Sequence, residues 1–184
     1  MVLSWAKTML KVGKIFISNK NNAIMKKQKI WKIINLQNFK SIKDCLKKNK
    51  KEKIHISPWV EDIIKNNINN FPINKKKVFL YRIKVKDLGF KKATKLKDIY
   101  KKIKQKNFEL VSLDLALVAR ISYKNQKTGE WLRFATPFNS MIDSDGVPHL
   151  PKLGKALNKY FVETYWSYPH AIFHPHNEFV VCKK

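Results

Sequence analysis

Cysteine, glycine and proline are scarce in this sequence of 184 residues, with two, five and seven copies respectively. Cys45 and Cys182 lie far apart and form no paired pattern, so we expect neither a disulfide framework nor a cysteine-rich zinc site. So few glycines and prolines exclude collagen-like and Pro/Gly-rich chains. No apolar run approaches the ~20 residues that a membrane-spanning helix needs, so we expect no transmembrane segment.

Acidic side chains are also scarce: 13 Asp and Glu stand against 39 Lys and Arg, a net charge of +26. Residues 1–106 hold 30 basic and 6 acidic side chains, whereas residues 107–184 hold 9 and 7. Only three of the basic residues are arginines. Lysines attract phosphates as point charges and rarely read base edges. This asymmetry favours a polyanionic partner, and nucleic acid is the one we expect.

A compositional origin of the lysines is the competing interpretation. Lys, Asn and Ile dominate the first half of the chain, and A/T-rich codons encode all three. Salt dependence separates the two interpretations, because six lysine–phosphate contacts would give a slope of ~5 for log affinity against log salt concentration.

The change in charge density predicts two parts: a basic, partly helical N-terminal extension over residues 1–76 and a compact α+β domain over residues 77–184. With 44% hydrophobic and 12% aromatic residues, the chain can bury a core. Residues 1–25 lack acids and have one apolar helical face. They suit an organellar targeting segment or an extension before a start at Met25; otherwise we expect a cytoplasmic protein.

Hydrophobic periodicity predicts the local structure. We expect helices over residues 57–70 and 95–106, with Thr94 as the cap of the second and Asn107 as its left-handed end. We expect strands over 77–86, 117–124, 130–137, 160–166 and 178–182. The second and third of these would form a hairpin with Lys124 opposite Glu130 and Tyr123 opposite Trp131. The predicted fold class is α+β, an antiparallel β meander of five or six strands packed on one main helix, with the lysine-rich helical N-terminal extension before it.

These features predict a non-enzymatic, nucleic-acid-associated binding module that contacts RNA or DNA phosphates through a lysine-rich arm, as a ribonucleoprotein subunit would. No cofactor is expected. Among the tryptophans, Trp5 and Trp31 are the candidates for exposed stacking platforms. The predicted phosphate-neutralising residues are Lys26, Lys27, Lys29, Lys32, Lys47, Lys48, Lys50, Lys51, Lys75, Lys76 and Lys77.

Two other function classes remain open: a protein-interaction subunit of a larger assembly, and a metal-dependent hydrolase or nuclease. The hydrolase would use weak metal candidates in two clusters, which are Asp143, Asp145, His170, His174 and His176. The Asp-Ser-Asp-Gly segment resembles the start of a calcium loop, but Gly154 stands where the loop's bidentate Glu belongs. Prolines bracket the histidines and argue against a ligating helix. A convergent acid–base set of Asp114, Glu130, His149 and Glu163, with Arg120 or Arg133 beside it, is a further possibility that no spacing demands.

Overall fold

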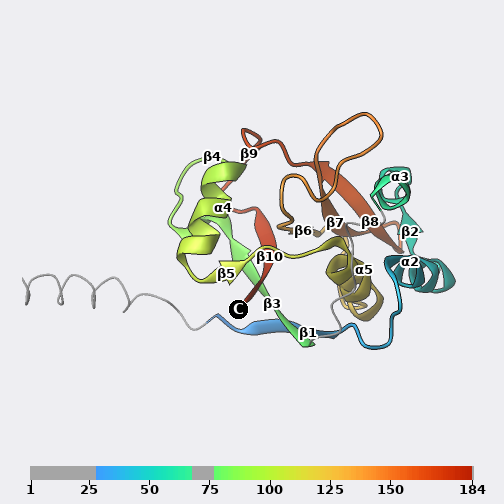
Figure 1. Cartoon of the computed structure of the whole chain (residues 1–184). Coiled ribbons are helices and arrows are strands. Elements are labelled where there is room, and N and C mark those ends of the chain that lie inside the picture. Colours follow the sequence, from blue (N-terminus) through green and yellow to red (C-terminus); the bar gives the residue numbers. More distant parts are fainter. Residues whose placement is uncertain (1–27, 68–76, 184) are drawn as a thin grey trace, which may run out of the picture.

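The computed structural model describes residues 28–67 and 77–183, which form a mixed α/β fold (Figure 1). In chain order, the described elements are β1 (Ile30–Asn35), α2 (Ile42–Lys51), β2 (His55–Ile56), α3 (Pro58–Asn66), β3 (Lys77–Lys84), the short 3-10 helix η2 (Val85–Leu88), β4 (Thr94–Lys95), α4 (Leu96–Gln105), β5 (Phe108–Glu109), α5 (Leu113–Ser122), β6 (Trp131–Phe134), β7 (His149–Ala156), β8 (Lys159–Trp166), β9 (Ile172–Phe173) and β10 (Glu178–Lys183). None of the helices in these ranges is long and apolar enough to cross a bilayer.

The main sheet has the strand order β1-β3-β10-β6-β7-β8-β2, and β5 also pairs with β10. The C-terminal strand β10 therefore lies in the interior of the sheet. It runs antiparallel to β3 but parallel to β6, and β2 runs parallel to β8. The predicted antiparallel meander on one helix is thus not what the chain forms. The sheet is mixed because strands distant in the sequence join it at both sides of the β6–β8 meander.

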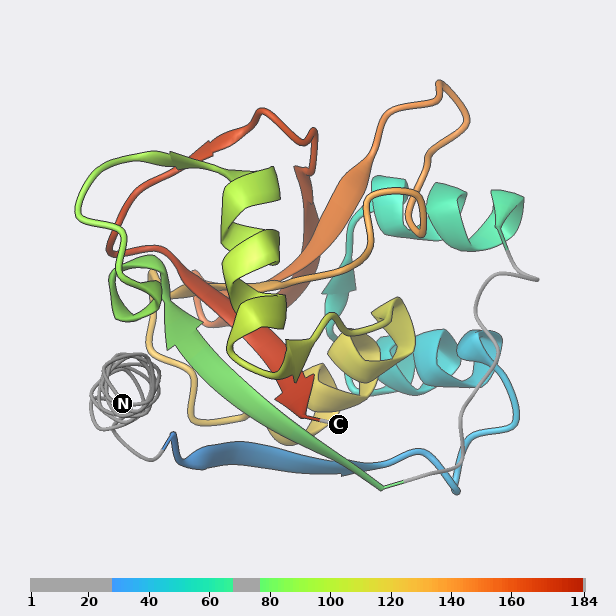
Figure 2. The same ribbon diagram turned by 60° about the vertical axis from the view of Figure 1, so that its left-hand side comes forward.

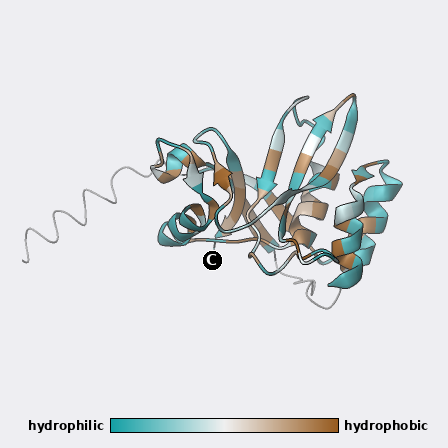
Figure 3. Ribbon diagram, turned by 90° about the horizontal axis from the view of Figure 1, so that it is seen from above, coloured by the Kyte–Doolittle hydropathy of each residue, from teal (hydrophilic) through white to brown (hydrophobic). Residues whose placement is uncertain are grey.

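Helices cover both faces of the sheet, and each face has its own apolar cluster. Residues of α2, α3 and α5 share one cluster with alternate strand residues such as Leu80, Leu153 and Val162. The other cluster joins α4 and η2 to strand residues that include Ile83 and Phe179. Figure 1 shows α4 at one end of the molecule and the pair α2 and α3 at the other, and Figure 2 shows α2 and α3 side by side, away from α4. Apolar residues gather toward the centre, between these helices (Figure 3).

The described part of the predicted N-terminal extension, residues 28–67, packs into the same body as the rest of the chain. Strand β1 pairs along β3, and Ile34 and Ile42 are buried in the cluster that contains α5. The buried amide of Asn49 in α2 donates to the carbonyls of Cys45 and Leu117, which ties α2 to α5. The packing therefore has no boundary at Lys77, and a separate lysine-rich arm is not confirmed. The predicted amphipathic segment 1–25 lies outside the described residues.

Several local predictions are confirmed. The strands predicted over 77–86, 160–166 and 178–182 are β3, β8 and β10, and the predicted helices are α3, which ends at Asn66 and not near Asn70, and α4. Asn107 ends the helical segment with φ 58°, as expected for an asparagine in the left-handed region. The cap of α4 differs from the prediction: Lys95 occupies the N-cap position, and Thr94 belongs to β4.

The strand predicted over 117–124 is wrong, because residues 117–122 belong to helix α5. Eight of the ten residues of α5 are buried, from Leu113 to Arg120. A helix buried on almost all sides has no polar stripe, so its apolar run is easily mistaken for a buried strand. The predicted hairpin register fails with it. Lys124 instead forms an ion pair with Glu52, and Glu130 binds Arg82.

Candidate nucleic-acid interface

Helix α2 presents a row of lysines on the surface of the folded body. Its first turn is fixed by a capping box, in which the Ser41 hydroxyl accepts from the Asp44 N–H and the Asp44 carboxylate accepts from the Ser41 N–H. Ile42 and Cys45 are buried, so the opposite face must be exposed. The exposed lysines of the helix are Lys43, Lys47, Lys48, Lys50 and Lys51.

Two of these lysines have acidic partners. Lys48 lies 3.4 Å from Glu52, and Lys50 lies 2.6 Å from Glu61. Within residues 28–67 and 77–183, Lys43, Lys47 and Lys51 form no ion pair. They follow one another at a spacing of four residues, which places them ~6 Å apart along the helix. This row is a stripe of uncompensated positive charge.

The remaining predicted phosphate contacts lie elsewhere. Lys29 and Lys77 are exposed at strand β1 and at the start of β3. Lys32 is half-buried: its Nζ donates to the carbonyl of Ser122 at 3.1 Å and lies over the ring of Tyr123. Burial, and then the nearby Arg120 charge, lower the pKa of Lys32. It therefore has an internal role in the structure. Lys26, Lys27, Lys75 and Lys76 lie outside the described residues.

The two tryptophans predicted as stacking platforms give no such platform in the described structure. Trp31 is half-buried, with its ring 5.0 Å from that of Tyr123 and 6.3 Å from that of Phe134. Both contacts are edge-to-face packing of the kind that stabilises a core. Trp5 lies outside the described residues.

A second lysine row, which composition alone did not mark as a site, lies on α4. Leu96, Ile99 and Ile103 are buried beneath this helix, and Lys97, Lys101 and Lys104 are exposed opposite them. The described residues carry 30 of the 39 basic side chains and all 13 acidic ones, a net charge of +17. Most of the charge excess is therefore on the folded body and not on an appendage.

The strand register also assembles a row of aromatic side chains that the sequence alone did not reveal. His55 of β2 pairs with Phe161 of β8, Phe161 with Gly154 of β7, and Gly154 with Trp131 of β6. The adjacent residues along these strands, Val162, Leu153 and Leu132, point to the opposite face of the sheet. They are buried in the apolar cluster that contains α5. The row therefore faces away from α5. The sequence showed the alternation along each strand but not which strands are adjacent.

The next row on this face is charged. Glu163 pairs with Lys152, and Lys152 pairs with Arg133. The guanidinium carbon of Arg133 lies 5.5 Å from the centre of the Tyr165 ring, and Lys152 Nζ lies 4.2 Å from the centre of the Trp131 ring. Burial lowers the pKa of Arg133 and of Lys152. Two cations and one carboxylate thus lie beside the aromatic row.

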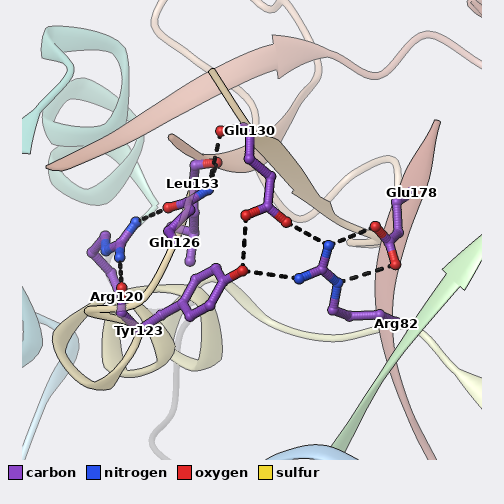
Figure 4. A network of polar contacts seen from close by, with 7 residues as sticks. All are labelled: Arg82, Arg120, Tyr123, Gln126, Glu130, Leu153 and Glu178. Carbon is purple, nitrogen blue, oxygen red and sulfur yellow. Dashed lines mark hydrogen bonds and ion pairs between the residues drawn. The ribbon is translucent and has the colours of Figure 1, made fainter. Parts of the chain in front are cut away.

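Arg82 organises a polar network on the α5 side of the sheet (Figure 4). Its guanidinium makes a bidentate contact with Glu178, at 3.0 Å from Nε and 2.6 Å from Nη2. It also donates to Glu130 at 2.5 Å and to the Tyr123 hydroxyl at 2.9 Å, and that hydroxyl donates to Glu130. Burial would lower the pKa of Arg82, but Glu178 and Glu130 raise it overall. Both carboxylates are engaged by this one guanidinium, so we interpret the network as structural.

Arg120 of α5 is fully buried and has a different set of partners (Figure 4). It donates to the Gln126 side chain and to the carbonyls of Tyr123 and Gly154. Gln126 in turn donates to the carbonyls of Glu130 and Leu153. Burial lowers the pKa of Arg120 to about 10. The side chain fixes the 123–130 loop to β7 and cannot reach a surface ligand.

The acid–base set considered from the sequence does not converge. His149 Nε2 lies 2.9 Å from the Asp143 carboxylate, and Nδ1 lies 3.0 Å from the Thr164 hydroxyl. Both ring nitrogens are therefore occupied, and Trp59 stacks on the ring. Asp143 also accepts from the backbone N–H groups of Asp145 and Val147. His149 and Asp143 together fasten the turn at 143–146 to the sheet.

The metal candidates are not brought together either. His174 and His176 stack in parallel with ring centres 5.6 Å apart, and His170 stacks on Tyr168. Throughout the described ranges, no three His, Cys, Asp or Glu side chains are arranged to hold a metal ion. The Asp143 carboxylate is engaged with His149 and two backbone N–H groups instead.

Comparison of the chain with protein-family models, with curated proteins and with solved structures gave no match.

Proposed function

We propose that this protein is a non-enzymatic module that binds nucleic acid through its phosphates, with the lysine row of α2 as its principal contact. The observation that carries the proposal is the row Lys43, Lys47 and Lys51, which is exposed, regularly spaced and without an acidic partner among the described residues. Lysines in such a row neutralise successive phosphates and release their counterions, which is the main source of sequence-independent affinity.

The surroundings of the row support a polyanionic partner. The described body has a net charge of +17, which attracts a phosphate chain over long range. Two of the three arginines, Arg82 and Arg120, are held by internal hydrogen bonds and cannot read guanine edges. The function that we propose is therefore binding without base-edge recognition.

The test is fluorescence anisotropy of the full chain with a labelled oligonucleotide over a range of salt concentrations. Replacing Lys43, Lys47 and Lys51 together by Gln should lower the slope of log affinity against log salt by about 2 to 3, since each lost phosphate contact removes ~0.7–0.9. Gln has nearly the helix propensity of Lys, so the variant should fold.

The matched control removes the same charge from the other end of the molecule, by replacing Lys97, Lys101 and Lys104 of α4 by Gln. This variant should retain most of the wild-type slope. Equal losses in both variants would mean that net charge alone attracts the ligand, and the α2 interface would be wrong. An affinity of wild-type protein that does not change with salt would contradict nucleic-acid binding itself.

A further inference from the structure

The outer face of the β6–β8 meander, opposite α5, carries an arrangement that the lysine row does not explain. On this face, the rings of His55 in β2, Phe161 in β8 and Trp131 in β6 form a row. Gly154 of β7 lies between Phe161 and Trp131 in the register. Neighbouring strands are ~4.8 Å apart, so rings in such a row are close enough to contact consecutive flat groups of one ligand.

We propose that this face binds unpaired bases, so that the protein prefers single-stranded nucleic acid over duplex. The inference rests on the proposed function and names the form of nucleic acid that it takes. Every base has a π face, and stacking on an aromatic ring is therefore tolerant of sequence. In a duplex the bases are already stacked on one another and cannot reach these rings.

Gly154 keeps the row open. The indole of Trp131 lies so close to Gly154 that a Cβ at this position would overlap its six-membered ring. The absence of a side chain therefore leaves room for the six-membered ring of the indole beside β7, where Lys152 Nζ lies 4.2 Å from the ring centre and would be displaced by a stacking base. The Trp131 and Phe161 rings are 6.3 Å apart and tilted by 44°. Both are half-buried, and His55 beside them is exposed.

The charged row supplies contacts for the backbone of the same ligand. Arg133 and Lys152 follow the aromatic row on this face, and Glu163 is the one carboxylate paired with them across the strands. No described carboxylate forms an ion pair with Arg133, and its buried Nε has no acceptor. Lys159 adds a third, exposed cation at the end of the hairpin, paired with Ala156. The face is therefore complementary to a chain that alternates flat bases with negative phosphates.

The aromatic row also ends close in sequence to the lysine row. His55 is separated from Lys51 by three residues, of which Glu52 and Lys53 are exposed, and Glu52 is paired with Lys48 and Lys124. Figure 1 shows β2 next to α2 at the sheet edge. A strand that crosses the sheet from Trp131 to His55 arrives at the C-terminal end of the lysine row. One ligand can thus use both surfaces.

The experiment compares wild-type full-length chain and the double variant W131L/F161L in anisotropy titrations. The probes are labelled single strands of about ten uridylates or thymidylates and a DNA duplex of the same length. We expect wild type to prefer both single strands over the duplex. The variant should bind the single strands at least tenfold more weakly, because each lost stacking contact costs roughly five- to a hundredfold in affinity. Its duplex affinity should be unchanged, which also shows that it is folded.

Two further variants test whether the aromatic ring at this position is responsible for the affinity. Trp131→Phe keeps an aromatic ring and should restore most of the single-strand affinity, whereas Trp131→Leu should not. Trp166 lies on the same strand as Phe161, on the opposite side by alternation, and is 64% exposed. Trp166→Leu therefore controls for loss of an exposed aromatic and should change nothing. The uridylate and thymidylate arms distinguish RNA from DNA as the preferred strand.

The inference is overturned if wild type binds duplex as tightly as single strands, or if W131L/F161L binds single strands normally. Either result leaves the proposed phosphate binding intact. Equal losses for single strands and duplex in the variant would also overturn it, because stacking would not be the cause. If wild type binds none of the probes, both the inference and the proposed function fail.

Discussion

Arg82 of β3 and Glu178 of β10 are 96 residues apart in the chain and form a bidentate ion pair across the sheet. The pair lies where β10 enters the interior of the sheet, with Glu130 and Tyr123 joined to the same guanidinium. Each of the three charged side chains is less than a quarter exposed. The network therefore links three distant segments of the chain at a single point.

Replacing Arg82 by Met should lower the free energy of unfolding by about 2–3 kcal/mol, because two half-buried carboxylates lose their counter-charge. Arg82→Lys should recover only part of this, since an ammonium group cannot bind Glu178 in a bidentate manner. Urea denaturation followed by circular dichroism measures both. Lys84→Gln, at an exposed position on the same strand, is the control and should change the value by less than ~0.5 kcal/mol. An unchanged stability of Arg82→Met would show that the network contributes nothing.

The sequence predicted the elements in which one face is apolar and the other polar. The alternation in β3 and β8 and the stripe in α4 were readable because each of these elements has an exposed side. Helix α5 was not, because its residues from Leu113 to Arg120 are all buried and carry no periodic polar signal. The error extended to the predicted hairpin, because that hairpin required residues 117–124 to form a strand.

The sequence also did not show which strands are adjacent in the sheet. The parallel contact of β10 with β6 joins residues more than forty positions apart, and no local pattern encodes such a contact. The same limitation hid the aromatic row, because His55, Phe161 and Trp131 are neighbours only through the register. The lysines, by contrast, were visible from composition, although their place on the folded body was not.

Stability should fall with acid in a way that depends on Asp143. Burial would raise the pKa of this carboxyl, but its hydrogen bonds with His149 and the Val147 N–H lower the pKa below the usual 3.8. The unfolded chain therefore binds a proton at a higher pH than the folded chain does. The stabilisation is complete above the unfolded pKa and is lost as pH falls through the folded one.

Replacing Asp143 by Asn should therefore flatten the decline of unfolding free energy between about pH 5 and pH 3. Urea titrations at several pH values measure this slope. Asp145→Asn, at an exposed position in the same turn, is the matched control and should keep the wild-type slope. Identical slopes in all three proteins would contradict the role given to Asp143.

Both thiols should be inert in the folded protein. Burial raises the pKa of Cys45 to about 12 and that of Cys182 to about 11, and the two are not bonded to each other. Since the thiolate is the reactive form, Ellman's reagent at pH ~8 should label neither rapidly in native protein, and both after unfolding in urea. Rapid labelling of native protein would contradict the burial.

Gly154→Ala should be destabilising, because the new methyl group would overlap the Trp131 indole. Forcing a side chain into such a contact costs roughly 1–3 kcal/mol. The steric origin is tested by a double-mutant cycle with Trp131→Leu, read out by urea denaturation. The cost of Gly154→Ala should shrink when the indole is absent. An undiminished cost would place its cause in the backbone of β7.

The most direct test of the account is a salt titration of full-length protein with a labelled single strand, repeated with an unlabelled duplex as competitor. We predict binding whose logarithmic affinity falls linearly with log salt, with a slope that corresponds to at least three phosphate contacts, about 2 or more in magnitude. The duplex should displace the single strand poorly. Affinity that is absent, or that does not change between low and high salt, would contradict nucleic-acid binding by this basic fold.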